Sequence, residues 1–357
     1  MLLPKAIAFY SHKFITWIAI PILVLTSVDY QELYTNFWLA PLIAIIAVLV
    51  SAAISLIAID LDKIDEKIRL LLRSHKFSNI SGVNLGINHH QGTSTSHSHT
   101  HSHKKLVHTL WTENMQDSFL ASSLIGNTNY IAFAIISLIV ISSNTKDSLT
   151  YPILFDISSY ILGIFIFILF VQTRENQKRT QGQNITQELT KAFNKTKLHL
   201  LNNQVFVNII VCFLIGTVIS FGVSFNGNNQ GFFQEKLQGL VNITITIKTL
   251  IVYLYLIGLG TQFSTNKYKF AFKSIFMFLI SKALIVPIMI GALLIMMEIN
   301  PLLMLPLLIQ VAMPPKLLDP QLSKDYKLLP EFINSVSSVG AITVMFVVPI
   351  WVSLYYL

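Results

Sequence analysis

Four consecutive small or polar residues interrupt one apolar stretch, 119–143: Gly126, Asn127, Thr128 and Asn129. An amide side chain in hydrocarbon is unfavourable unless it is hydrogen-bonded, and this run suits irregular backbone better than a packed helix. We therefore expect an interrupted helix whose amides bind a polar solute. Hydrogen bonding between neighbouring helices is the simpler alternative.

A second apolar stretch, 302–318, contains prolines within it and at its end. The adjacent Pro314 and Pro315 remove two consecutive backbone donors, so the freed carbonyls must line a cavity or find other partners. Gln310, in the same run, is a further candidate for the site. A simple kink would explain the prolines alone. Because each break falls in the last-but-one apolar run of its half of the chain, a matching pair is favoured.

Two lysines are predicted to lie at membrane depth. Lys248 is near the middle of 239–262, and Lys282 is midway along 271–297. A buried lysine pairs with an anionic ligand, pairs with a carboxylate or titrates. Snorkelling is a weak alternative for Lys248, which is about 14 Å from either end of its run. We expect these lysines, ahead of Asp156, to contribute charge to a substrate site.

Histidines are concentrated in one segment of low complexity within 77–108. Seven of the ten histidines lie between His89 and His108, among serines and threonines. Neutral imidazoles on such a loop can chelate Zn, Ni or Cu. We favour adventitious binding, because no cysteine or carboxylate fixes a geometry. The candidate metal ligands are His97, His99, His101 and His103.

The composition is typical of an integral membrane protein. The chain of 357 residues is 53% hydrophobic and 12% charged, whereas a soluble domain carries about 25% charged residues. The single cysteine, Cys212, excludes a disulfide framework and a cysteine-based zinc site. No HExxH, GxSxG or Walker A pattern occurs, so neither an enzyme nor a cofactor is expected. The net charge of +8 does not indicate nucleic-acid binding, because the basic residues fall between apolar runs.

The hydropathy pattern predicts an all-α polytopic membrane protein with nine transmembrane helices. A bilayer core needs roughly 20 apolar residues per helix. Residues 60–76 are expected to continue one helix beyond the membrane. The nine runs are 13–28, 38–59, 119–143, 152–172, 204–224, 239–262, 271–297, 302–318 and 331–356.

The connections between these runs predict the orientation. Of the 25 lysines and arginines, 21 lie in one alternating set of connections and 2 in the other. The basic set faces the cytoplasm, so we expect a multi-pass protein of the plasma (inner) membrane, with a cytoplasmic N-terminus and an outside C-terminus. The basic connection 173–203 links the N-terminal half, 1–172 with four runs and the insertion 77–108, to the C-terminal half, 204–357 with five runs.

Several of these segments resemble the auxin efflux carrier family of permeases, whose fold is related to that of bile-acid sodium symporters. The similar segments are TWIAIPILVL, GNTNYIAFA, IVYLYLIGLG, SKALIVPIM, VAMPP and SVSSVGAITVMFVVP. Gly126, Asn127 and Thr128 match the family pattern, and Pro314 matches the proline of the second crossing helix. Ala132 and Ala134 stand where the family has glycine and proline.

The resemblance implies two inverted repeats of five helices. The fourth helix of each repeat is broken, and the two breaks cross in mid-membrane to form the substrate site. The first helix of the first repeat has no counterpart in this sequence. Half-helix N-termini at such a crossing would present N–H groups that favour an anion.

These features together predict a secondary transporter of small organic anions, carboxylates in particular, that works by alternating access in a lipid bilayer. A homodimer is a further expectation. The alternative is a divalent-metal transporter that uses the histidine-rich loop. We disfavour it because all ten histidines lie outside the apolar runs.

Overall fold

A computed structural model gives the structure of the chain. It describes residues 14, 17–18, 20–28, 37–78, 112–126, 132, 135–136, 150–178, 185–225, 250, 272–315 and 320–356. Within these ranges all the named elements are helices, and one isolated backbone bridge is the only extended pairing.

Five helical runs are long and apolar enough to cross a membrane, with qualifying stretches of 19 to 28 residues. In the part of the chain that the structure describes, they agree with the predicted all-α membrane protein, and each overlaps one of the nine predicted runs. The five are α4 (Leu39–Ser78), α7 (Thr150–Lys178), α9 (Gln204–Phe225), the continuous α11 (Phe272–Leu279), η4 (Ile280–Ile285) and α12 (Val286–Met296), and α15 (Pro330–Tyr356).

Two helices within the predicted runs are about half as long as a membrane-spanning helix, and we call them half-helices. The helices α5 (Glu113–Leu124) and α13 (Pro301–Val311) have 12 and 11 residues. At 1.5 Å per residue they reach about 18 and 16 Å, against a bilayer core of about 30 Å. Both helices stop near the predicted breaks. Most of 127–143 and all of 316–319 lie outside the described ranges, so the spans predicted at 119–143 and 302–318 stay predictions.

The other predicted runs are described less completely. The first run contains α2 (Ile20–Ser27), a helix of 8 residues that packs against α9. Within 239–262 only Leu250 is described. Nine spans and an inverted repeat stay predictions.

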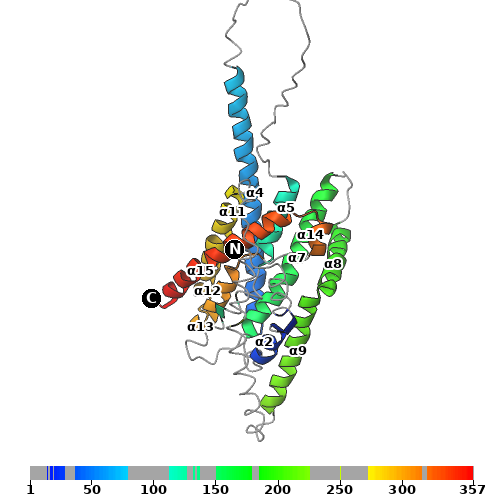
Figure 1. Ribbon diagram of the computed structural model, residues 1–357, viewed down its shortest axis with the longest axis vertical. Helices are drawn as coiled ribbons and strands as arrows, with labels where there is room; N and C mark the ends of the chain where they lie inside the picture. Colours follow the sequence, from blue (N-terminus) through cyan, green and yellow to red (C-terminus); the bar gives the residue numbers. More distant parts are fainter. Residues whose placement is uncertain are drawn as a thin grey trace, which may run out of the picture.

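The helix α4 is longer than its membrane stretch. Its apolar part ends at Leu61, and the helix continues to Ser78, beyond the neighbouring helices (Figure 1). This confirms the predicted helical continuation past residue 60. Apolar residues of this part, Leu61, Ile64 and Ile68, are at least half exposed.

Asn203 separates two helices that follow one another along one side of the molecule, α8 (Ile185–Asn202) and α9 (Figure 1). Its side-chain oxygen accepts a hydrogen bond from the Phe206 N–H at 3.2 Å, as expected of a residue that caps a helix start. Its amide nitrogen donates to the Tyr160 hydroxyl at 2.7 Å. The cap therefore also ties the junction of α8 and α9 to α7.

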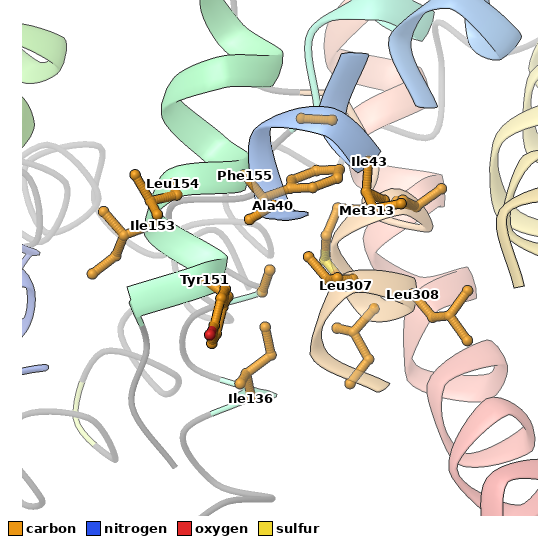
Figure 2. Packing of buried hydrophobic residues seen from close by; sticks show 14 of the residues in the cluster. Ala40, Ile43, Ile136, Tyr151, Ile153, Leu154, Phe155, Leu307, Leu308 and Met313 are labelled. Carbon is orange, nitrogen blue, oxygen red and sulfur yellow. The ribbon is translucent and has the colours of Figure 1, made fainter. Parts of the chain in front are cut away.

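The buried apolar side chains form two clusters. One is built mainly from α2, α13, α12 and the starts of α4 and α7, and includes Ala40, Phe155 and Met313 (Figure 2). The other contains α5, α11 and the later parts of α4 and α7, and includes Phe119 and Ile125. Each half-helix thus ends among the residues of a different cluster.

Polar contacts gather at one end of the helices, around α8, the short α14 (Pro320–Asp325) and the starts of α5 and α15. We call this the polar end. The Ser118 hydroxyl accepts the Leu329 N–H at 2.8 Å, and His199 Nε2 lies 3.6 Å from an Asp325 carboxylate oxygen. Burial, together with the negative charges of Asp325 and Glu175, raises the pKa of Tyr326 to about 12.

An ion pair at the polar end joins α5 to α7. Asp117 is buried, and one of its oxygens accepts a hydrogen bond from Arg174, whose side chain is 21% exposed. Removing one member of a buried pair leaves the other without its counter-charge, which is strongly destabilising. The partial exposure of Arg174 reduces that effect.

We expect Asp117→Ala to lower the free energy of unfolding by about 1–3 kcal/mol. Melting temperatures of the purified variants Asp117→Ala, Arg174→Ala and the double variant would measure the coupling between the two side chains. The double variant should be little worse than either single one. Additive losses would contradict an energetic role for the pair.

Candidate functional site

The half-helix α5 ends where the sequence predicts an interruption. Ile125 has extended backbone (φ −106°, ψ 91°), and its N–H bonds the Ala121 carbonyl at 3.0 Å. Gly126 follows in an extended pairing. The helix therefore stops before the polar run that begins with this glycine.

The half-helix α13 ends in a comparable way. After Val311, the N–H groups of Ala312 and Met313 still bond to carbonyls of the last turn, at 3.1 and 3.2 Å. The next two residues, Pro314 and Pro315, have no N–H with which to continue the helix. Both prolines are buried, so the break lies inside the protein.

One backbone bridge joins the two breaks. Gly126 pairs with Pro315 in an antiparallel bridge, although the two residues lie in different halves of the chain. Because proline has no N–H, this pairing is of the type in which the two facing residues do not bond each other directly, with α-carbons about 4.5 Å apart. We call residues 124–126 and 311–315 the crossing.

The described half-helices lie on the N-terminal side of each break. Both α5 and α13 present their C-terminal ends to the crossing, and a helix C-terminus carries partial negative charge. The residues directly after Gly126 and Pro315, which would form the predicted N-terminal ends, lie outside the described ranges. The described half-helices by themselves therefore favour positive charge at the crossing, so an anion bound there needs a cationic side chain.

Lys282 is a buried cationic side chain in a membrane-spanning run. It is 8% exposed, and its ammonium group donates a hydrogen bond to the Ser51 hydroxyl at 3.3 Å. Among the described residues the structure gives it no ion pair. It lies in the π-helical stretch η4, and such wide turns occur frequently at functional sites.

The depth of Lys282 is close to that of the crossing. Phe278, one turn earlier, packs edge-to-face on Phe119 with ring centroids 6.0 Å apart. From this contact α11 and α5 both run away from the polar end (Figure 1). Lys282 lies about 6 Å further along its helix and Leu124 about 7.5 Å further along α5, at 1.5 Å per residue.

Three buried polar atoms near the crossing have no hydrogen-bond partner among the described residues: the hydroxyls of Ser122 and Ser337 and the side-chain oxygen of Gln310. The nitrogen of Gln310 donates to the Pro152 carbonyl at 2.7 Å, which ties α13 to α7. Buried polar groups are normally paired with protein or water. These atoms are thus available to a polar solute or to water.

The structure brings together part of the predicted site. Gly126, Pro314 and Pro315 meet at the crossing, Gln310 lies one turn before it, and Lys282 lies at similar depth. Several predicted residues lie outside the described ranges: Asn127, Thr128, Asn129, Lys248, His97, His99, His101 and His103.

Sequence reasoning missed the hydroxyl groups. Ser51, Ser122 and Ser337 are buried within apolar helices, where a lone serine usually bonds its own backbone. Serines inside predicted spans are the signal that could have identified them. Among the residues that the structure describes, no group of three His, Cys, Asp or Glu side chains could hold a metal ion.

Comparison of the sequence with known protein families gives no matching family, and comparison with curated proteins gives no match either. The resemblance to the auxin efflux carriers therefore stays a prediction.

Proposed function

We propose that the chain is a secondary transporter of small organic anions, carboxylates in particular, similar to the auxin efflux carrier permeases. The pairing of Gly126 with Pro315 is the observation that carries the proposal. Two half-helices that enter from opposite ends and stop at one point leave backbone groups without helical partners inside the protein. In a membrane, such irregular backbone is tolerated where it lines a cavity or is buried in protein.

The charge near the crossing supports an anion as the substrate. A buried ammonium group with only a hydroxyl as its described partner is unfavourable at membrane depth, and a bound carboxylate would neutralise it. The unpartnered hydroxyls of Ser122 and Ser337 can donate to carboxylate oxygens. Lys282 is accordingly the residue that selects a negatively charged substrate.

Uptake into proteoliposomes tests this function. The purified protein would be reconstituted and supplied with a panel of labelled mono- and dicarboxylates, with and without imposed proton and sodium gradients. At least one carboxylate should accumulate above the level of protein-free liposomes. Transport of neutral or cationic solutes, without any carboxylate, would overturn the proposed substrate class.

The proposed orientation has a cytoplasmic N-terminus and an outside C-terminus, in the plasma membrane. A reporter enzyme that is active only outside the cytoplasm should be active when fused after Leu357 and inactive when inserted at Gln183. The reason is the 21-to-2 distribution of basic residues between the two sets of connections. The reverse activity pattern would contradict the orientation.

A further inference from the structure

Two glycines in the long helices lie unusually close to the crossing. A Cβ atom added at Gly163 of α7 would lie 2.7 Å from the Leu124 carbonyl oxygen. One added at Gly340 of α15 would lie 2.6 Å from Cβ of Pro314. Real Cβ atoms essentially never approach other heavy atoms within 3.0 Å, so only glycine fits both positions without a shift.

The atoms opposite these glycines cannot move aside easily. Leu124 meets Gly163 with its backbone, and Pro314 meets Gly340 with its ring, so no flexible side chain can rotate away. Gly216 of α9 is less tightly placed, since an added Cβ would lie 3.2 Å from the Leu25 carbonyl oxygen, and Gly222 and Gly291 have more space. An added Cβ at Gly222 would meet nothing within 4 Å, and one at Gly291 would make ordinary contact with the flexible Leu308 side chain at 3.4 Å.

The two contacts are placed alike in the two halves of the chain. Among the described helices, α7 comes after the half-helix α5, and α15 comes after the half-helix α13 with only the short α14 between them. In each half, the glycine of the last helix touches the residues just before the bridge between Gly126 and Pro315. The crossing is therefore held between two close contacts, one from each half.

We propose that Gly163 and Gly340 are positioning residues that set how closely the crossing lies to α7 and α15, and thereby keep the two breaks paired for transport. Only the predicted effect on transport rests on the proposed function; the contacts of Gly163 and Gly340 do not. Small residues let backbones approach closely in a membrane, where packing supplies much of the contact energy. A methyl group at either position would push its segment of the crossing away and separate Gly126 from Pro315.

Cross-linking in membranes measures the pairing without any assumption about the substrate. The parent is Gly126→Cys/Pro315→Cys in a Cys212→Ser background, to which Gly163→Ala or Gly340→Ala is added. Each added alanine should slow disulfide formation at least tenfold. The matched controls Gly222→Ala and Gly291→Ala should cross-link at the parental rate. Parental rates in both Gly163→Ala and Gly340→Ala would overturn the proposal.

A size exchange separates positioning from general misfolding. In Pro314→Gly/Gly340→Ala the Cβ that meets the new methyl group is absent, so disulfide formation should return to within about twofold of the parental rate. If Gly340→Ala alone is not recovered from the membrane, this double variant shows whether the contact with Pro314 is the cause. Normal recovery and cross-linking would support the contact, and continued loss would overturn it.

Transport by the alanine variants, made with positions 126 and 315 unchanged, tests the link to function. Their uptake rate should fall at least tenfold, while the overpacking costs about 1–3 kcal/mol of stability and leaves the variants folded at the assay temperature. Slower cross-linking with unaffected uptake would refute the role in transport but leave the contact intact. A parental protein that transports no carboxylate would instead refute the proposed function.

Discussion

Oxidation of the double variant Gly126→Cys/Pro315→Cys, in a Cys212→Ser background, should join the two breaks by a disulfide and stop transport. The facing residues of this type of antiparallel bridge have α-carbons about 4.5 Å apart, within the range of about 4.4–6.8 Å that a disulfide requires. The disulfide should form in most molecules within minutes. After the chain is cleaved between its two halves, cross-linked molecules would be recognised by their slower migration in gel electrophoresis. Uptake should recover on reduction.

A second pair serves as the control for this experiment. In Gly126→Cys/Gly222→Cys one position lies at the crossing and the other near the exposed end of α9. This pair should not cross-link under the same conditions. Equal cross-linking of both pairs would mean that the reaction reports general mobility. A bridge pair that stays reduced would refute the pairing of the two breaks.

Replacing the buried lysine should separate transport from stability. Lys282→Met should weaken carboxylate uptake about 10- to 100-fold, because a hydrogen bond to a charged group contributes about 1.5–3 kcal/mol. The melting temperature should not fall, since methionine fills similar space without a buried charge that has only a hydroxyl as its described partner. Concentration-dependent uptake and thermal unfolding of the same preparation would measure both quantities.

The matched control is Lys324→Met, at an exposed position of α14. This variant should transport normally. Lys282→Arg keeps the positive charge but changes its shape, so it should recover part of the lost affinity. Normal uptake by Lys282→Met would remove Lys282 from the substrate site. Lost uptake together with a large fall in melting temperature would show that its role is structural.

The sequence predicted the long helices well because a membrane span needs little more than an apolar run of sufficient length. The ends of α7, α9 and α15 agree with the predicted runs within a few residues, apart from the polar extension of α7 to Lys178. Membrane crossing depends on composition summed over about 20 residues, so local errors cancel. The breaks at Gly126 and Pro314 were also predictable, because glycine and proline act on the backbone locally.

The contacts between the breaks could not be predicted in the same way. That Gly126 faces Pro315, or that Gly340 touches Pro314, depends on how distant helices pack, and a single sequence carries no direct record of this packing. The N-terminal ends expected after the two breaks stay a prediction, because the residues that follow Gly126 and Pro315 lie outside the described ranges.

The wide turn at η4 has a consequence for comparisons between related sequences. Buried side chains in this run recur every four residues. Four residues make slightly more than one turn of an α-helix, so successive side chains of such a row would rotate around the helix axis by about 40° at each step. The π-helical stretch takes up one additional residue and keeps both ends of the row facing the protein interior. The buried row in this run is Phe278, Lys282, Val286, Ile290 and Leu294.

In a related protein without the π-helical turn, the same helix would cover the same distance with one residue fewer. In an alignment, such a sequence should carry a single-residue gap within 280–285. Sequences that share the additional residue should also share a polar side chain at the position of Lys282, because the same insertion sets the direction of that side chain. The gap would therefore divide relatives into those with a polar side chain at this position and those without one.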